Sequence, residues 1–452
     1  GVPLMVLIIA GGLLLTIRLG LLQIRKLPLA LKWMLQNEEG GKGEISSFSA
    51  LCTALSATIG TGNIVGVATA VCAGGPGALF WMVVAAFLGM ATKYSEGLLA
   101  VKYRTVAEDG HSLGGPFYYI ELGMGKNFKW LAKIFAFFGV CVGLFGIGTF
   151  SQVNGISSAV HGFFDPNDAF TVKILPFLGE YSWSVVIASL ILSFCVAAVL
   201  IGGVKRIASV SQIIVPFMAV IYFVFAVILI CCNITKVPAA FATIVTAAFS
   251  PKAITAGAVG SMLIAMQKGV ARGIFSNEAG LGSAPIAAAA AQTNSPVRQG
   301  LVSMTGTFID TIIICTLTGL SIVLTGAWQV EGLEGVQVTT YAFQHGLPFP
   351  AQFSSFILML CLVFFAFTTI LGWDYYSERC LEYLSGGNMK HVKIFRWIYI
   401  LAVFIGPYMT VSAVWTIADI FNGLMAIPNM IALFALSGVI VKETRAFFQH
   451  AK

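Results

Sequence analysis

The stretch Ser56-Ala57-Thr58-Ile59-Gly60-Thr61-Gly62-Asn63 lies in the middle of an apolar segment that is long enough to cross a bilayer. Its last six residues include two glycines, two threonines and an asparagine. Glycine costs roughly 1 kcal/mol inside a helix, and asparagine and threonine compete for backbone hydrogen bonds. Backbone released from a helix at membrane depth must be buried in protein or line a cavity. The stretch therefore predicts a broken membrane helix whose free ends hold a ligand.

The alternative is a continuous helix, because Gly62 and Gly66 form a small-xxx-small pattern that often marks only close helix packing. A second stretch, 273–285, has the same mixture of glycine and polar residues in the later half of the chain. Paired interruptions in corresponding halves are the sequence pattern of a transporter binding site. The pair favours two broken helices that meet.

The composition excludes a soluble protein. The chain has 452 residues, of which 58% are hydrophobic and only 10% charged, whereas soluble proteins carry about 25% charged residues. The apolar runs are about twenty residues long and do not alternate, so we expect an all-α polytopic membrane protein embedded in a lipid bilayer and no β-barrel. The net charge of +7 is spread over the loops, which does not suggest a nucleic-acid partner. The nine cysteines lie mostly in apolar runs and form no CxxC motif, so we expect neither a disulfide framework nor a metal centre.

Eleven apolar segments are predicted to span the membrane. They are 3–24, 48–72, 78–101, 130–160, 183–202, 208–232, 254–289 with an interruption, 300–326, 352–384, 394–410 and 413–441. Every second loop is basic, and the alternate loops 161–181 and 327–350 are poor in lysine and arginine. Because basic loops face the cytoplasm, we expect the N-terminus outside and the C-terminus inside.

The span count suggests an inverted repeat. We expect a leading transmembrane helix at 1–24, five-helix repeats at 48–232 and 254–441, and a cytoplasmic tail at 442–452. Since five is odd, the second repeat enters the membrane from the opposite side, and the two breaks meet near the midplane. Three shorter segments predict helices that do not span. They are 114–125, expected at the cytoplasmic interface because of its aromatic residues, and 237–250 and 336–348, expected outside.

Three motifs carry a family resemblance. The first break, the run Gly74-Gly75-Pro76-Gly77-Ala78-Leu79-Phe80-Trp81-Met82 closing at Gly89, and Ser276-Asn277-Glu278-Ala279-Gly280-Leu281-Gly282-Ser283-Ala284-Pro285 resemble the alanine/glycine:cation symporter family. The resemblance runs across essentially the whole chain. It implies a LeuT-type fold, with the leading span added to a ten-helix plan, and sodium-driven uptake of alanine or glycine. We expect a multi-pass protein of the plasma (inner) membrane of a prokaryote.

A neutral amino acid is a zwitterion, so both of its charged ends must be satisfied at mid-membrane. A half-helix that begins near Gly62 points free N–H groups and a positive dipole end outward, and we assign Thr61, Gly62 and Asn63 to the carboxylate. Carbonyls freed at the second break around Phe275, Ser276 and Asn277 suit the ammonium, and the Asn277 side chain could add a contact. Helix capping is the alternative role for both asparagines.

Two further side chains are predicted to complete the substrate pocket. Gln152 could donate its amide to the substrate or bridge two helices. Trp373 follows Thr369, itself a pocket candidate, by one helical turn on the same face. We interpret Trp373 as a wall that limits side-chain size, with simple packing as the alternative.

Sodium prefers hard oxygen ligands. The carbonyls of Ser56 and Ile59, with the hydroxyls of Thr368 and Thr369, would make one sodium site, because the family resemblance implies that these two helices meet there. Threonine also bonds readily to its own helix carbonyls, which is the alternative. A second cation beside Thr58 and Asn63 is the weaker assignment.

Charged residues at membrane depth are functional candidates by default. In the predicted spans they are Lys268, Arg272, Glu278, Asp310, Asp374 and Asp419. Arg272 and Glu278 flank the second break and are expected to pair as a gate, whereas Asp310 has no assigned role. Lys93 and Glu96 lie near a cytoplasmic end and are expected to snorkel to the interface.

The sequence thus predicts a secondary active transporter that couples uptake of small neutral amino acids to sodium by alternating access. The alternative is proton coupling, which Glu278 or Asp310 could serve. We find no catalytic constellation and no cofactor motif, so we expect neither an enzyme nor a bound cofactor beyond the coupling ion.

Overall fold

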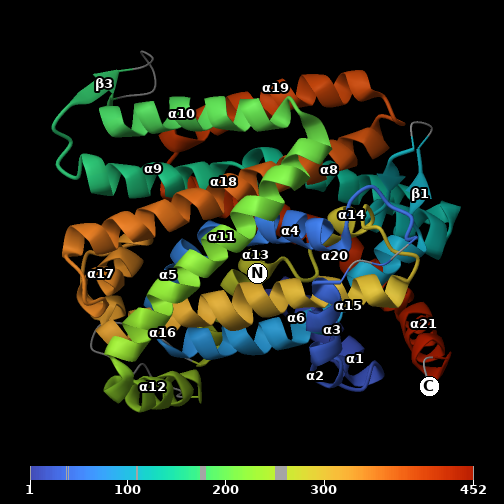
Figure 1. Cartoon of the computed structure of the whole chain (residues 1–452), viewed down its shortest axis with the longest axis horizontal. Helices are drawn as coiled ribbons and strands as arrows, with labels where there is room; N and C mark the ends of the chain where they lie inside the picture. Colours follow the sequence, from blue (N-terminus) through green and yellow to red (C-terminus); the bar gives the residue numbers. More distant parts are fainter. Residues whose placement is uncertain are drawn as a thin grey trace.

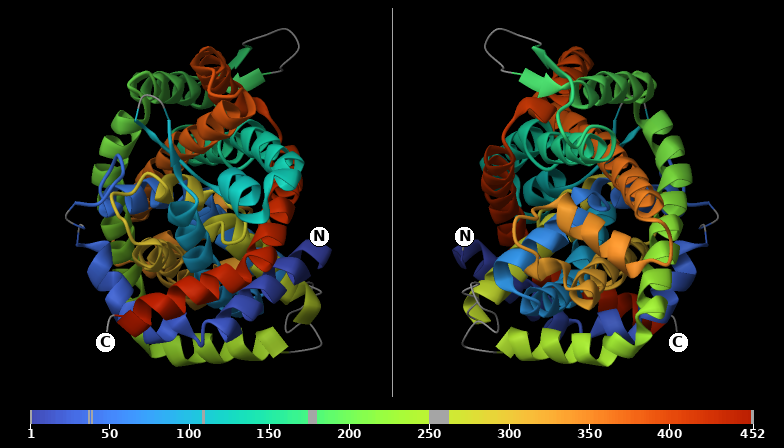
Figure 2. Two further views of the ribbon diagram at one scale, coloured as in Figure 1. Left: turned by 90° about the vertical axis from the view of Figure 1, so that its right-hand side faces the viewer. Right: turned by 90° about the vertical axis from the view of Figure 1, so that its left-hand side faces the viewer.

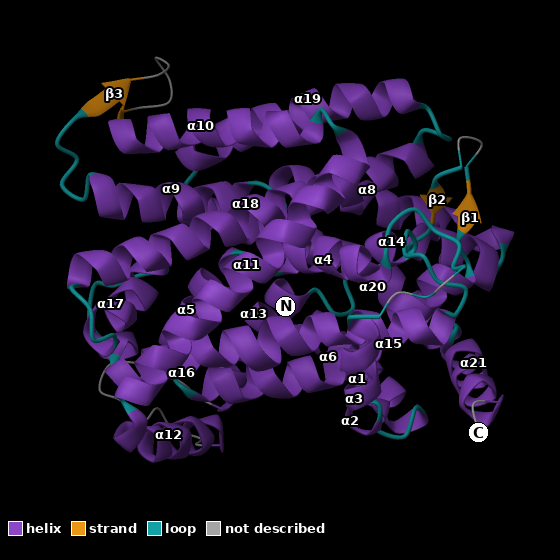
Figure 3. Cartoon of the chain, in the orientation of Figure 1, coloured by secondary structure: helices purple, strands orange, loops and turns teal. Residues whose placement is uncertain are grey.

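A computed structural model describes residues 2–36, 38, 40–107, 110–173, 180–249 and 262–450 (Figure 1). Helices make up most of this part of the chain (Figure 3). Two short antiparallel hairpins accompany them. These are β1 Thr105–Val106 with β2 Ser112–Leu113, and β3 Thr171–Lys173 with β4 Glu180–Ser182.

The first part of the chain contains helices up to residue 249. They are α1 Val2–Arg18, α2 Leu22–Arg25, α3 Leu27–Met34, α4 Ser47–Thr58, η1 Gly62–Gly66, α5 Val67–Gly74, α6 Gly77–Lys102, α7 Pro116–Tyr118, η2 Tyr119–Met124, η3 Lys126–Phe128, α8 Lys129–Phe145, α9 Phe150–Phe164, α10 Trp183–Leu200, α11 Gly203–Cys232, η4 Ile234–Lys236 and α12 Val237–Phe249.

The second part begins again at residue 262. Its helices are α13 Met262–Asn277, α14 Ala284–Ala288, α15 Pro296–Thr307, η5 Phe308–Cys315, α16 Thr316–Thr325, η6 Ala327–Gln329, α17 Val336–Gly346, α18 Ala351–Leu384, α19 Met389–Ile405, η7 Gly406–Tyr408, α20 Val411–Ala435 and α21 Ser437–His450.

Two groups of helices pack side by side. In one, α13 and α15 pack on α6, and α14 packs on α4. In the other, α8 and α9 pack on α18, and α10 and α19 cover them along one edge of the molecule, opposite α12 (Figure 1). Helix α11 crosses obliquely and contacts both α4 and α18, and Figure 2 shows it along one side. The site described below lies where the two groups face each other.

The helices include many that can cross a bilayer. Seven in the described residues are long and apolar enough, and an eighth span is the pair 47–58 and 62–74, which bends by 52° at its break. Helix α1 is a shorter apolar helix that ends at Arg18, so the predicted span 3–24 extends too far. Gly20 and Leu21 take positive φ values of 63° and 54° and turn the chain there. The start of the predicted span 254–289 lies outside the described residues.

The predicted span 130–160 lies within one candidate span, residues 126–164. That span is interrupted at 146–149, between α8 and α9. A Cβ on Gly148 would lie 2.6 Å from the Cβ of Trp373, so only glycine fits against that side chain. The sequence shows no long polar interruption here, which is why the break was not predicted.

Three short segments were predicted to form helices that do not span the membrane. Helices α12 and α17 confirm the predictions for 237–250 and 336–348 as short helices. The segment 114–125 also forms helical turns, and its position at the cytoplasmic interface stays a prediction. Phe117 and Tyr119 are fully buried, and the Phe117 ring stacks on Tyr383 with centroids 4.9 Å apart.

Candidate functional site

The first break is held by its own asparagine. Helix α4 ends at Thr58, Ile59 is extended, and the π-helical turn η1 begins at Gly62. The Asn63 Oδ1 accepts a hydrogen bond from the Gly60 N–H at 2.9 Å, and the Asn63 N–H donates to the Gly60 carbonyl at 3.2 Å. Asn63 therefore caps the break, because its side chain replaces the helical partner that Gly60 lacks.

A buried carboxylate connects the first break to the second. Asp310, in the π-helical segment η5, accepts from Asn63 Nδ2 at 2.7 Å and from Ser276 Oγ at 2.9 Å. Thr311 Oγ1 also donates to it, at 2.6 Å. None of these side chains is more than 1% exposed. Asp310 thus gives both breaks a shared partner.

The second break turns through residues with positive φ. Helix α13 ends at Asn277, and Glu278, Gly280 and Gly282 then take φ values of 58°, 89° and 82° before α14 begins. Asn277 Nδ2 donates to Thr311 Oγ1 at 3.0 Å, and its Oδ1 accepts from Ala279 N–H at 2.9 Å. Asn277 therefore caps the second break, as Asn63 caps the first.

The two breaks are in direct contact. A Cβ on Gly62 would lie 3.1 Å from the Ser276 Cα and 3.2 Å from the Phe275 Cδ1. A side chain at this position would push the breaks apart. The predicted carboxylate group around Gly62 and the predicted ammonium group around Ser276 thus lie side by side.

Gln152 and Thr369 enclose the first break from α9 and α18. Gln152 Oε1 accepts from the Thr61 N–H at 2.9 Å, and Thr369 Oγ1 lies 3.2 Å from the Ile59 carbonyl oxygen. A Cβ on Gly60 would lie 2.5 Å from Thr369 Oγ1 and 2.7 Å from Gln152 Oε1. Thr61 Oγ1 is buried with no hydrogen-bond partner in the described part of the chain.

Oxygen atoms of two helices gather beside Ile59. The hydroxyls of Thr368 and Thr369 both donate to the Phe365 carbonyl, at 3.1 and 3.0 Å. These are the bonds to a threonine's own helix that the sequence left as the alternative. Ser56 also lies against α18, since a Cβ on Gly372 would be 2.8 Å from its Oγ. Carbonyl and hydroxyl oxygens of this kind suit a hard monovalent cation.

Thr58 and Asn63, the residues assigned to a second cation, bond to different partners. Thr58 Oγ1 donates to the carbonyls of Ala54 and Leu55 in its own helix, at 3.2 and 3.3 Å. The Asn63 side chain bonds instead to Gly60 and Asp310. The structure records no hydrogen bond between Thr58 and Asn63 among the described residues.

Trp373 lies between the second break and the break that separates α8 from α9. Its side chain is fully buried, and its indole Nε1–H donates to Glu278 Oε1 at 2.7 Å. Its ring packs edge-on against Tyr376, with centroids 5.4 Å apart. The predicted wall is therefore held against the second break by a hydrogen bond to a carboxylate.

The expected gate between Arg272 and Glu278 is wrong. Arg272 donates to both carboxylate oxygens of Asp419, at 3.2 and 3.3 Å, and its guanidinium lies 4.4 Å from the Trp415 ring centroid. The Trp415 ring in turn packs on Phe275, with centroids 4.7 Å apart. The partner lies on α20, far along the chain, so sequence proximity pointed to the wrong acid.

The site faces a vestibule on one side. A cavity of about 590 Å³ has Val65, Ser151, Gly155 and Trp415 among its lining residues, which are neighbours of the first break, Gln152 and the Phe275 ring. This vestibule also contains residues of the 327–350 loop region.

The opposite side of the site is closed by a clasp. Ile45, just before α4, forms a β-bridge with Ala291, just after α14. The Arg104 guanidinium donates to the carbonyls of Ala289, Ala291, Lys42 and Thr293. The segments that lead into and out of the two breaks are thus tied together at this end.

Two charged residues are buried where snorkelling was expected, so that expectation is wrong. Lys93 is 2% exposed and Glu96 is fully buried. Glu96 Oε1 accepts from Asn429 Nδ2 at 2.7 Å and from the Gly280 N–H at 3.2 Å, so it braces the second break. In the sequence, the signal for this burial was a lysine and a glutamate one turn apart in a mainly apolar helix.

Two interrupted helices that meet around buried polar groups, inside a multi-pass helical membrane protein, are the architecture of a secondary transporter. The model of the sodium:alanine symporter family matches residues 1–452, and the chain belongs to that family. The family and the relatives described next are transporters and not enzymes, as the sequence predicted.

The chain is 55% identical to an uncharacterized transporter of Haemophilus influenzae, over 100% of this chain and 94% of the relative. It is 46% identical to the sodium/alanine symporter AgcS of Methanococcus maripaludis, over 99% of this chain and 94% of the relative. Its structure matches that of MhsT in complex with L-phenylalanine with a TM-score of 0.57 at 12% identity, over 91% of this chain and 100% of MhsT. The last match confirms the LeuT-type fold.

Proposed function

We propose that the chain couples the uptake of alanine or glycine to sodium entry by alternating access. The observation that carries this proposal is the contact between the two breaks, where Gly62 packs on Phe275 and Ser276 and where Asp310 bonds to both sides. The zwitterion of a small amino acid matches a site with helix ends of both polarities. The sodium/alanine symporter AgcS, a relative at 46% identity, supports the same substrate and ion.

The proposal includes the topology. The helices are arranged as five-plus-five inverted repeats with a leading helix, giving eleven spans in the plasma membrane of a prokaryote. The vestibule then opens outside, because it is bordered by the loop regions 161–181 and 327–350, which are poor in basic residues. The Arg104 clasp closes the cytoplasmic side. The N-terminus lies outside and the C-terminus inside.

In this proposal the substrate carboxylate meets the first break. The unpartnered Thr61 hydroxyl and the backbone at Gly62 donate to it, and Gln152 orients the Thr61 amide. The ammonium faces carbonyls near Ser276. Asn63 and Asn277 act by capping the breaks, so they hold the backbone donors and acceptors in place. Phe275 covers the pocket on the vestibule side, where it packs against Trp415.

Sodium is proposed to bind among the Ser56 and Ile59 carbonyls and the hydroxyls of Thr368 and Thr369. Thr369→Ala removes a ligand worth on the order of 1–2 kcal/mol, so the apparent Kd for sodium should rise about tenfold. Alanine affinity at saturating sodium should change less. Thr325→Ala is the control, because within the described part of the chain that hydroxyl bonds only to carbonyls of its own helix. Unchanged sodium affinity in folded Thr369→Ala protein would rule out this ligand.

Trp373 is proposed to limit the size of the substrate side chain. Trp373→Ala should admit leucine, because it removes most of the bulk of a fully buried ring beside the second break. A change in pocket volume of this kind alters discrimination by tenfold or more. Competition of leucine with radiolabelled alanine in proteoliposomes measures it. If the variant transports alanine and still excludes leucine, the wall lies elsewhere.

Proton coupling is the second candidate, and one observation favours it. Asp310 and Glu278 are carboxylates with no exposed surface at the site, and such groups serve as proton relays in transporters. The cation site, by contrast, consists of carbonyls and hydroxyls that do not titrate near neutral pH. Calorimetry of alanine binding with and without sodium tests the main proposal, which requires sodium to strengthen alanine binding at constant pH.

A further inference from the structure

Glu278 is held in an unusual backbone conformation at the second break. Its φ of 58° lies in the left-handed region, which is uncommon for a residue with a side chain. Such a conformation persists only where the surrounding structure determines it, and it is often found at functional sites. Here it places the carboxylate between α18 and the start of α14.

The Glu278 carboxylate has two donors of different elements. Oε1 accepts from the indole N–H of Trp373 at 2.7 Å, and Oε2 accepts from the Ser283 hydroxyl at 2.5 Å. The indole has a single polar atom, which can only donate. The bond to Glu278 therefore fixes the rotation of the Trp373 ring about its long axis. It also joins α18 to the group of helices that contains α13 and α14.

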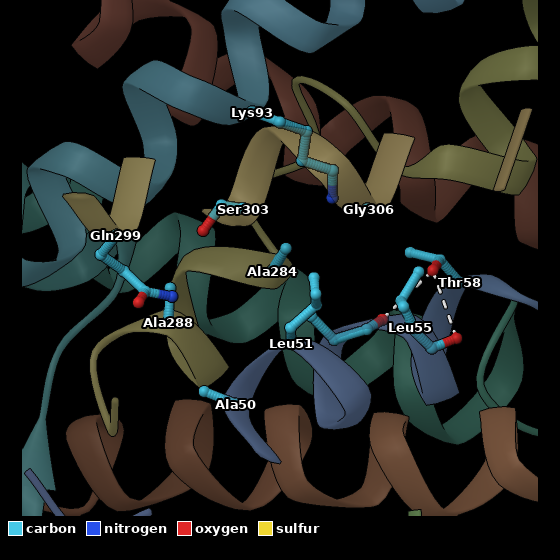
Figure 4. A pocket seen from close by; sticks show the side chains of 11 residues that line it. Ala50, Leu51, Leu55, Thr58, Lys93, Ala284, Ala288, Gln299, Ser303 and Gly306 are labelled. Carbon is cyan, nitrogen blue, oxygen red and sulfur yellow. Dashed lines mark hydrogen bonds between the residues drawn. The ribbon is translucent and has the colours of Figure 1, made fainter. Parts of the chain in front are cut away.

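The charge of Lys93 acts on this carboxylate without a direct contact. Its ammonium is within electrostatic range of three buried acids, Glu278, Glu96 and Asp310. The lysine is 2% exposed, and its Nζ has no hydrogen-bond partner among the described residues. Figure 4 shows its side chain extending toward a cavity of about 20 Å³, which has Thr58 and Ser303 among its lining residues.

A buried ammonium is costly unless an opposite charge compensates it. The cavity has room for about one water molecule, and the nearby acids disfavour a bound anion. The charge that compensates Lys93 is thus that of the buried acids themselves, and Glu278 and Glu96 in turn need a cation. These buried charged side chains form a cluster that braces the second break.

We propose that Glu278 is a positioning residue that sets the size limit of the substrate pocket by holding the Trp373 ring, and that Lys93 supplies its counter-charge. This inference rests on the proposed function, in which Trp373 is the wall of the pocket. Glu278 itself touches no substrate in this account. It acts through the indole, and Lys93 acts through Glu278.

Glu278→Met tests the positioning role with a side chain of similar length. A methionine carries only a thioether, which is a weak acceptor, so it offers the Trp373 indole no strong hydrogen bond. Glutamine is not suitable here, because its oxygen can accept from Trp373 while its amide donates to the Ser283 hydroxyl. The leucine-to-alanine affinity ratio in proteoliposomes should rise roughly tenfold. Trp373→Phe keeps a ring but has no N–H, and it should produce a similar rise. Combining the two substitutions should add little, because both remove the same hydrogen bond.

The outcomes separate this inference from the proposed function. If Trp373→Ala excludes leucine, the wall itself is misplaced. If Trp373→Ala admits leucine while Glu278→Met and Trp373→Phe keep the wild-type ratio, the wall stands and the positioning role is overturned. A general loss of alanine transport with an unchanged ratio in these two variants also overturns it, because it indicates only a structural role.

A separate experiment tests the role of Lys93. Lys93→Met leaves the acids uncompensated and should lower the melting temperature of the purified protein. The double variant Lys93→Met with Glu278→Gln removes one charge of each sign, and it should melt above Lys93→Met alone. This comparison also applies if Glu278→Met alone fails to fold. A double variant that melts at or below Lys93→Met would overturn the assignment of Lys93 as the counter-charge.

Discussion

Replacing Gly60 with alanine is expected to abolish alanine binding and its dependence on sodium. The added Cβ would lie 2.5 Å from Thr369 Oγ1 and 2.7 Å from Gln152 Oε1, which is closer than such atoms can approach. Thr369 belongs to the proposed cation site, and Gln152 orients the Thr61 amide of the substrate site. One methyl group therefore displaces both sites at once, and overpacking of this kind costs about 1–3 kcal/mol at each well-packed position.

Gly66→Ala is the matched control within the same broken helix. Its Cβ would have no neighbour closer than the Thr61 carbonyl oxygen at 3.9 Å, and its φ of −63° is helical. Alanine is favoured over glycine at such a position. Calorimetry should find wild-type affinities in Gly66→Ala and no measurable alanine binding in folded Gly60→Ala. Equal affinities in the two variants would mean that the first break does not form either site.

The second large effect is expected for Asn63→Ala. The substitution leaves the buried Gly60 N–H without its acceptor and Asp310 Oδ1 without its Asn63 donor. Each unsatisfied buried group costs about 1–3 kcal/mol. We expect this cost to fall on the bound conformation of the break. Alanine and sodium affinities should then both fall by tenfold or more.

Asn233→Ala controls for the loss of an amide. The Asn233 amide donates to two backbone carbonyls, those of Leu229 and Gly346, at the end of α11 and away from the site. Its substitution should leave the affinities unchanged. Melting temperatures, measured on the same variants, distinguish loss of binding from loss of folding. A folded Asn63→Ala protein with wild-type alanine affinity would contradict the role of this residue.

Both broken helices could be predicted because their signal is local. Glycine, threonine and asparagine weaken a membrane helix wherever they cluster, so the breaks at 59–61 and 278–283 were visible in the sequence. The proximity of Gly62 to Phe275 and Ser276 could be predicted, because paired breaks are expected to meet. Their roles toward alanine and sodium stay predictions, which the variants above test.

The missed features depend on contacts between distant parts of the chain. The α8–α9 break lies in a stretch without long polar interruption, and Gly148 is needed there because Trp373 packs on it. Arg272 bonds to Asp419 on a helix that no local pattern connects to it. Lys93 and Glu96 sit near a helix end, where snorkelling is the default, but the packing of α15 on α6 removes that route.

The coupling ion is the central claim, and uptake into proteoliposomes tests it most directly. A sodium ion that enters down 100 mV releases about 2.3 kcal/mol, and a tenfold gradient adds about 1.4 kcal/mol. One sodium per alanine would therefore support accumulation by roughly 500-fold. An inward sodium gradient at equal pH should drive alanine uptake, and a pH gradient in sodium-free buffer should not. Uptake that follows the pH gradient without sodium, and that is lost in Asp310→Asn or Glu278→Gln but kept in Thr369→Ala, would contradict sodium coupling.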